Sequence, residues 1–319
     1  MNYTIDACGA GQTIKQYLTR GLGLSRRTIS LLKYRDRGIT VNGEHKTVRY
    51  VLCEGDELNL FYEDFENTTN ISPSLGEIDV IYEDDVLLCV NKPPFLPMHP
   101  SRGGLGDTLA ARVVAYMGNP FVFRASTRLD RNTSGVVVVS KDRLVSANMA
   151  KLFADRKVDK VYLAIVIGNL KERSGKSGFI DYNIRRQNGS IITREATSAT
   201  EGEGGKNSPF GASALTRYTV LDSTASHSLV VAYPMTGRTH QLRVHFAAAG
   251  YPILGDDLYG QASPVMARQA LHACRLSFAH PATGEPLHIF APLGEDFLEA
   301  LHACGLKGCE QMGEVKQNA

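Results

Sequence analysis

The chain has 319 residues, of which 43% are hydrophobic and 21% are charged. These proportions are typical of a globular protein and exclude a wholly disordered or fibrous one. The longest apolar runs, such as residues 136–139 and 161–167, are too short to cross a bilayer, and the first residues lack the basic start and apolar stretch of a signal peptide. We therefore expect a cytoplasmic protein without membrane contact, built from one large and one smaller domain.

The six cysteines are spread along the chain and include no CxxC pair. A secreted disulfide framework would be shorter and denser, and a structural zinc site usually needs closely spaced cysteine ligands. We therefore expect free thiols and no structural metal site.

The first helices are predicted close to the N-terminus. Apolar residues at helical spacing predict a helix over residues 13–22. Ser25 is a candidate N-cap for a second helix over residues 26–37, which Gly38 closes. A strand that runs into the Asn-Gly turn at residues 42–43 predicts a hairpin, so this part of the chain is expected to form a small α/β module.

This module, residues 1–62, carries an excess of positive charge, although the net charge of the whole chain is only +2. It holds nine Lys/Arg against six Asp/Glu, and many of the basic residues gather between Arg20 and Arg37. A local patch of this kind can bind phosphates even when the whole protein is nearly neutral. Residues 63–77 are acidic and polar with no basic residue, which predicts a linker.

After the linker, strand and helix signals follow one another in irregular order. Without regular βαβ alternation, this order favours an α+β fold with a mixed, largely antiparallel sheet flanked by helices. The Gly-rich, charged segment at residues 201–208 predicts a surface loop. Strands are predicted over residues 78–82, 86–91, 136–140, 158–167, 214–221 and 228–232, and helices over residues 107–116, 144–153 and 239–249.

The densest polar cluster is the segment of residues 128–135, which runs directly into the β-branched strand at residues 136–139. A polar loop that leads into a buried strand is a common place for functional side chains, because the strand fixes the end of the loop. Arg128 and Asp130 project to the same side of an extended chain. For an Asp considered alone, the simpler interpretation is a turn in which it caps backbone amides.

A second cluster covers residues 234–245, where Thr239 could begin a helix whose first turn faces an anion. The alternative is an exposed basic helix. His240 and His245 invite a metal hypothesis, but their spacing of five residues does not place both on one helical face, so metal is not favoured. A third candidate, Tyr162, lies in a predicted strand, where a core aromatic would be the commoner interpretation.

Together these clusters resemble the RluA-type family of pseudouridine synthases, which isomerise uridine to pseudouridine in RNA. The resemblance spans residues 78–297 with its motifs in consistent order, which is far more specific than any one motif. The matching motifs are Asn91-Lys92-Pro93, His99-Pro100, Arg128-Leu129-Asp130, Thr133-Ser134-Gly135, residues 236–245, Gly255-Asp256, Leu271-His272-Ala273 and His280-Pro281.

The resemblance assigns the catalytic role to Asp130, a single carboxylate that adds to the base, adds to the sugar or deprotonates the sugar. Arg243 is expected to hold both oxygens of this carboxylate with its planar fork, which would favour the charged form against desolvation. Tyr162 is expected to stack on a base flipped out of the RNA, and its hydroxyl could shuttle the proton of carbon 5. The isomerisation is redox-neutral and releases nothing, so neither a cofactor nor a metal is expected.

RNA contacts are expected in both parts of the chain. Arg128 is expected to fill the gap left by the flipped nucleotide or to grip phosphates, with Arg238 as a further RNA contact. The first segment is similar to the small αL (S-four-type) RNA-binding module that many of these enzymes carry, and this module favours structured ribosomal RNA over transfer RNA as the substrate. Its expected contacts are Arg26, Arg27, Lys33, Arg35 and Arg37.

The expected domain organisation has four parts, and the protein is expected to be a monomer. One departure from the family concerns Thr127, which stands where a His usually precedes the Arg-Leu-Asp triplet, so any role of that side chain is weakened. The four parts are an αL module over residues 1–62, an acidic linker over residues 63–77, a synthase domain over residues 78–303 and a flexible tail over residues 304–319.

Two alternatives belong to other functional classes. A non-catalytic protein that binds structured RNA on a degenerate synthase fold would have lost the pocket residues, yet Asp130, Tyr162 and Arg243 are all present. A hydrolase of glycosidic bonds would generally need two carboxylates, and these motifs place only one.

Overall fold

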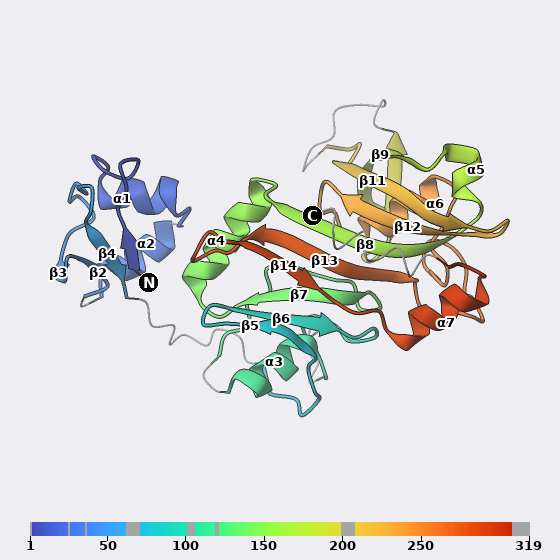
Figure 1. Ribbon diagram of the computed structural model, residues 1–319, viewed down its shortest axis with the longest axis horizontal. Coiled ribbons are helices and arrows are strands. Elements are labelled where there is room, and N and C mark those ends of the chain that lie inside the picture. Colours follow the sequence, from blue (N-terminus) through green and yellow to red (C-terminus); the bar gives the residue numbers. More distant parts are fainter. Residues whose placement is uncertain are drawn as a thin grey trace.

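The computed structural model describes residues 2–24, 26–35, 37–61, 71–100, 106–118, 121–198 and 208–307. They form two separate sheets, one of four strands in the N-terminal module and one of ten strands in the rest of the chain (Figure 1). Several predicted features lie outside the described residues. They are the cap at Ser25, the side chain of Arg27, the linker up to residue 70, the loop at residues 201–207 and the tail from residue 308.

The N-terminal module places two short helical segments against its four-stranded sheet, whose order is β1-β4-β2-β3. The helix predicted over residues 13–22 is a short α-helix followed by a π-helix, and the second helix ends at Lys33 rather than Arg37. Asn42 and Gly43 have φ angles of 53° and 81°, so the predicted Asn-Gly hairpin is confirmed. The elements are β1 (Asn2–Thr4), α1 (Ile14–Gln16), η1 (Tyr17–Gly21), α2 (Arg26–Lys33), β2 (Ile39–Val41), β3 (Glu44–His45) and β4 (Glu57–Leu60).

The large sheet has the strand order β10-β9-β11-β12-β8-β13-β7-β6-β5, with β14 paired to β13. Of its described strand pairs, β13 with β7 is parallel and the others are antiparallel, so the predicted mixed, largely antiparallel sheet is confirmed. The strands are β5 (Val80–Glu83), β6 (Leu87–Lys92), β7 (Ser134–Ser140), β8 (Val158–Ile167), β9 (Ser177–Arg186), β10 (Arg194–Ser198), β11 (Ala212–Ser223), β12 (His227–Pro234), β13 (Leu271–Ala279) and β14 (Pro286–Phe290).

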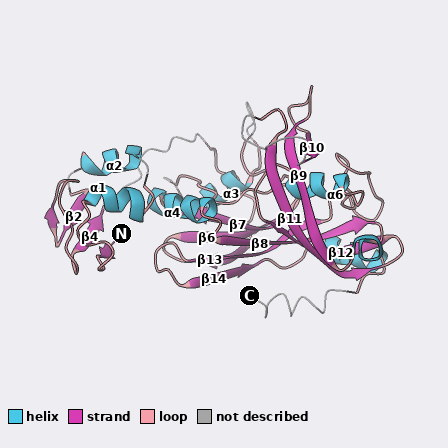
Figure 2. Ribbon diagram, turned by 90° about the horizontal axis from the view of Figure 1, so that it is seen from above, coloured by secondary structure: helices cyan, strands magenta, loops and turns pink. Residues whose placement is uncertain are grey.

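Helices flank this sheet (Figure 2). Alternate residues of β7 point to opposite faces, so that Val137 and Val139 pack in one core cluster with α3, whereas Val136 and Val138 pack in another with α4. A further cluster joins β8, β11 and β12 to α5, α6 and α7. The helices are α3 (Leu109–Met117), α4 (Arg143–Ala154), α5 (Leu170–Ser174), α6 (Gln241–Ala248) and α7 (Glu295–Ala303).

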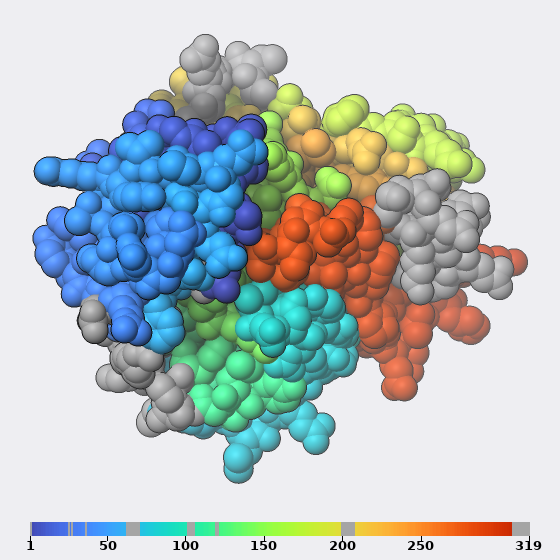
Figure 3. All heavy atoms as spheres, turned by 60° about the vertical axis from the view of Figure 1, so that its left-hand side comes forward, coloured from blue at the N-terminus to red at the C-terminus, as the bar shows by residue number. Residues whose placement is uncertain are grey.

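The N-terminal module is docked on α4 of the large domain. Lys151 donates hydrogen bonds of 3.0 Å to the carbonyl oxygens of Arg20 and Gly21, and Leu144 belongs to the core cluster of the module. These contacts satisfy carbonyl groups at the end of η1, which a helix terminus would otherwise leave to water. Figure 3, in which the module faces the viewer, shows it beside the large domain.

The chain remains packed for a few residues beyond α7. Cys304 and Leu306 are buried in the cluster that contains α7, and the backbone N–H of Lys307 donates to the carboxylate of Asp222 at 2.7 Å. Residues 304–307 therefore do not belong to the flexible tail that was expected over residues 304–319, because the side chains of Cys304 and Leu306 pack in the core.

Candidate active site

Asp130 lies on the loop that precedes β7, and the backbone of this loop is fixed from several sides. The ammonium group of Lys92, at the end of β6, donates to the carbonyl oxygens of Pro93, Leu96 and Arg131 at 2.7, 3.0 and 3.0 Å. Three carbonyls match the three N–H donors of a lysine whose side chain is fully buried. Burial and the charge of Arg268 lower the pKa of Lys92 to about 7, although Asp130 opposes the shift.

A second anchor comes from the segment before β13. Arg268 is buried, pairs with Asp296 through two hydrogen bonds of 2.6 and 3.1 Å, and donates to the carbonyl oxygen of Asn132 at 3.3 Å. The next residue of the loop, Thr133, accepts a bond of 3.1 Å from the amide of Gln269. The end of the short turn after Asp130 is therefore held by a segment more than 130 positions away in the sequence.

Gly135 brings the end of this loop against β13. Its φ angle is 117°, and a Cβ atom built on it would lie 2.2 Å from the carbonyl oxygen of Ala273. Only glycine accepts both the backbone conformation and this close approach. Ser134 adds a hydrogen bond of 2.9 Å to Nδ1 of His272, so the start of β7 is fixed beside the middle of the sheet.

A pocket of about 310 Å³ opens above this part of the sheet. It is lined by Asp130 from the loop, Tyr162 from β8, Arg243 from α6, and Arg128 and Arg238 from its exposed edge. The structure thus brings the three predicted catalytic residues to one cavity, with two of the predicted RNA contacts beside them. Its volume is within the range of about 300–1,000 Å³ that is usual for small-molecule sites.

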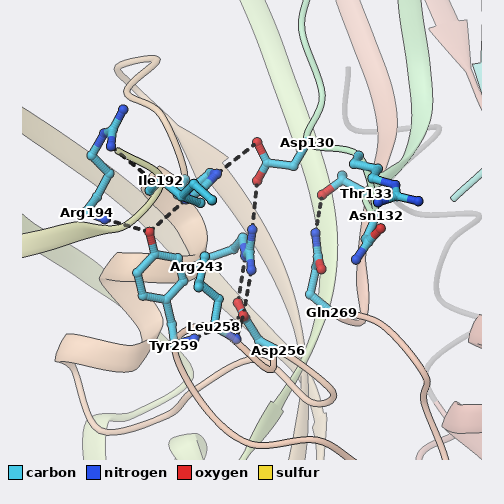
Figure 4. A network of polar contacts seen from close by, with 12 residues as sticks. Asp130, Asn132, Thr133, Ile192, Arg194, Arg243, Asp256, Leu258, Tyr259 and Gln269 are labelled. Atoms are coloured by element: carbon cyan, nitrogen blue, oxygen red, sulfur yellow. Dashed lines mark hydrogen bonds and ion pairs between the residues drawn. The ribbon is translucent and has the colours of Figure 1, made fainter. Parts of the chain in front are cut away.

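The contacts of Arg243 differ from the expected ones. Its fork pairs with Asp256, whose carboxylate accepts two hydrogen bonds of 2.7 Å, and only Nη1 reaches Asp130, at 3.5 Å (Figure 4). Asp256 is fully buried, so its charge must be neutralised inside the protein, whereas the carboxylate of Asp130 remains partly exposed to the pocket. Burial opposes the charge of Arg243, but the hydrogen bonds and charge of Asp256 raise its pKa.

His240 also lies beside the carboxylate of Asp130, a position that was not predicted from the sequence. Its Nε2 lies 3.8 Å from Asp130, and its Nδ1 shares a hydrogen bond of 2.7 Å with the hydroxyl of Tyr259. The residue has a left-handed backbone with φ 57° and precedes α6, which begins two residues later than expected. Burial lowers the pKa of His240, although Asp130 opposes this shift, so the ring is predominantly neutral at neutral pH.

Tyr162 and Thr127 both line the pocket, but their side chains have different surroundings. The hydroxyl of Tyr162 has its pKa raised, first by burial and then by the negative charge of Asp130, so it stays protonated at neutral pH. The hydroxyl of Thr127 accepts a hydrogen bond of 3.0 Å from the backbone N–H of Val138. The residue before the Arg-Leu-Asp triplet therefore ties its loop to β7.

The predicted RNA contacts of the N-terminal module lie apart from the pocket. Arg26 and Lys33 are exposed residues of α2, whereas Arg35 and Arg37 follow that helix and Arg35 is partly buried. None of the four lines the pocket around Asp130.

In the part of the chain that the structure describes, no three His, Cys, Asp or Glu side chains come together in a way that could hold a metal ion. No helix in the same part of the chain is long and apolar enough to cross a membrane.

A mixed sheet with a carboxylate, an arginine and a tyrosine around one small pocket is the arrangement expected from the resemblance to pseudouridine synthases. The RNA pseudouridylate synthase family model matches residues 86–248. The uncharacterized RNA pseudouridine synthase YjbO of Bacillus subtilis is 34% identical over 89% of this chain and 96% of its own length. Ribosomal large subunit pseudouridine synthase C of Vibrio vulnificus is 31% identical over 91% of this chain and 92% of its own length.

A solved structure shares the fold. Human RNA pseudouridylate synthase domain containing 1 superposes with a TM-score of 0.59 and 27% identity, over 77% of this chain and 97% of that one. The chain belongs to the RluA-type family of RNA pseudouridine synthases. It is an isomerase that makes pseudouridine in RNA, as the motifs predicted.

Proposed function

We propose that Asp130 is the carboxylate that starts the isomerisation of uridine. The observation that carries this proposal is the position of its side chain, which lines a nucleotide-sized pocket while two buried cations, Lys92 and Arg268, hold the turn that follows it. Its carboxylate is 28% exposed, and its polar contacts with the described residues are 3.5 and 3.8 Å long, so it is accessible to a substrate. A carboxylate in this setting can act as nucleophile or base without a metal or a coenzyme.

The other pocket residues would prepare this carboxylate and hold the base. Arg243, itself fixed by Asp256, presents one N–H to Asp130 and would favour its charged form. Tyr162 lines the pocket, where its ring would stack on the flipped uracil and its protonated hydroxyl could exchange the proton of carbon 5. His240, neutral and hydrogen-bonded to Tyr259, would orient the nucleotide beside Asp130.

Ribosomal RNA is our proposed substrate, because relatives that align with most of this chain are named for the large ribosomal subunit. We also propose that the protein acts in the cytoplasm and as a monomer. Carbodiimide-based mapping should compare RNA from cells with and without the gene. We expect one or a few pseudouridines of ribosomal RNA to disappear and to return when the gene is restored. Loss confined to transfer RNA would contradict this substrate.

The N-terminal module is proposed to bind structured RNA through its basic surface, chiefly around α2. The double substitution Arg26→Gln and Lys33→Gln should weaken binding of structured ribosomal RNA fragments, because these exposed cations would neutralise phosphates. We expect the slope of log affinity against log salt to fall by about 0.9 per lost contact on duplex regions. Lys171→Gln and Arg173→Gln on α5 remove the same charge elsewhere and should have little effect. Equal effects of the two double variants would contradict a specific role for the module.

A further inference from the structure

A second groove continues from the active-site pocket along the sheet. Its volume is about 900 Å³, and it shares Lys160, Arg238 and Arg275 with the lining of the pocket. The groove extends over the first residues of β8 and the end of β12 toward β9 and the turn after α4. A chain whose nucleotide occupies the Asp130 pocket would therefore have a continuous surface on which to lie.

The charge of this groove suits a polyanion. Five of the described residues that line it are Lys or Arg, and a single one, Asp159, is acidic. Arg156 and Arg217 are exposed, and Lys160 donates a hydrogen bond of 3.1 Å to the carbonyl oxygen of Thr236 at the boundary with the pocket. Cations that follow a groove in this way track a nucleic-acid backbone.

An aromatic strip crosses the groove on three neighbouring strands. Phe179 of β9 is paired with Arg217 of β11, and Arg217 is paired with Tyr233 of β12. These directly opposed residues lie on one face of the sheet. The guanidinium carbon of Arg217 lies 4.2 Å from the centre of the Tyr233 ring, and the side chain of Phe179 is 65% exposed. Stacked aromatic and guanidinium planes of this kind receive unstacked bases, whereas the bases of a duplex present no free faces.

The groove also ends close to the N-terminal module. Phe153 and Ala154, at the end of α4, line the groove, and Lys151 of the same helix holds the module. Three residues of an α-helix span only about 4.5 Å along its axis. The path from the pocket therefore leads toward the module, which is the second proposed RNA-binding surface.

We propose that this groove binds an unpaired stretch of RNA adjacent to the target uridine, with bases stacked on the strip of Phe179, Arg217 and Tyr233. The inference rests on the proposed entry of the uridine into the Asp130 pocket. It deepens that proposal by specifying the substrate class, which is a uridine flanked by single-stranded nucleotides rather than one within a continuous duplex.

The test measures binding of the full-length protein to a fluorescently labelled oligocytidylate of about ten nucleotides and to a blunt RNA duplex. Oligocytidylate contains no uridine, so the measurement does not depend on the chemistry assigned to Asp130. Phe179→Ala should weaken binding of the single strand by about 5- to 100-fold, the effect of losing one base–aromatic stack, and leave duplex binding unchanged. Arg217→Gln should do the same and also lower the salt slope by about 0.7.

Matched controls lie on other surfaces of the large domain. Leu298→Ala removes an exposed apolar side chain from α7, and Arg173→Gln removes an exposed cation from α5. Neither should alter single-strand binding. In assays of pseudouridine formation, Phe179→Ala should raise KM for RNA more than it lowers kcat. Unchanged single-strand affinity in both groove variants, or equal losses for single strand and duplex, would overturn this proposal. An active Asp130→Asn variant would instead refute the proposed catalytic role of Asp130.

Discussion

Replacing Asp130 by Asn should reduce pseudouridine formation by more than about 10³-fold, because an amide can neither attack the nucleotide nor accept its proton. The fold should be unaffected. The carboxylate is partly exposed, and its nearest polar neighbours in the described part of the chain, Arg243 and His240, are 3.5 and 3.8 Å away, so little stability depends on its charge. Single-turnover assays on RNA transcripts, with thermal unfolding of the same preparations, would measure both effects.

The matched control for this substitution is Asp257→Asn. Asp257 is exposed, follows the buried Asp256 directly and does not line the pocket. This variant should retain wild-type activity, and both variants should bind RNA with wild-type affinity. If Asp130→Asn retained full activity, the carboxylate would have no part in the reaction, and the chemistry would have to come from another group.

Arg243→Met should lower the free energy of unfolding by about 3–5 kcal/mol, because it leaves the fully buried carboxylate of Asp256 without its cation. Activity should fall as well, since the same guanidinium reaches Asp130. Chemical denaturation and the rate of pseudouridine formation would measure the two effects. Arg112→Met is the control, because its pair with Asp107 is on the surface and is expected to contribute about 0–1 kcal/mol.

A double variant separates the structural from the functional contribution of this arginine. Arg243→Met combined with Asp256→Asn removes both charges of the buried pair, so it should be more stable than Arg243→Met alone. Activity should not recover, because Asp130 still lacks its cationic neighbour. Recovery of activity together with stability would mean that Arg243 acts through the fold alone.

The sequence was sufficient to predict the residues that meet in the pocket, since Asp130, Tyr162 and Arg243 belong to separate motifs with recognisable order. It was not sufficient to predict their pairing. Arg243 lies within reach of two carboxylates, those of Asp130 and Asp256, and it pairs with the one that is buried. Which carboxylate is buried is decided only when α6 packs against the turn that contains Asp256. Likewise, His240 reaches the site through a left-handed backbone that no local pattern indicated.

The prediction of the sheet shows the same limit. Strands with continuous apolar runs, such as β7 and β8, were located to within about two residues. Strands β9 and β10 were missed, because β9 has neither a continuous apolar run nor regular alternation and β10 is half-buried throughout. Their order depends on the pairing of β9 with β11 and of β10 with β9. The aromatic strip of the groove lies in this region, so it too became visible only once the register of three strands was known.

The anchoring of the loop around Asp130 has an energetic consequence for turnover. Lys92 and Arg268 bind its backbone carbonyls, Gln269 binds the side chain of Thr133, and Gly135 permits the contact that fixes its end. The conformational entropy of this segment is therefore already lost when the protein folds. Binding energy from RNA is not needed to order the attacking group and remains available for everting the nucleotide, which is the costly step for an enzyme that works on stacked bases.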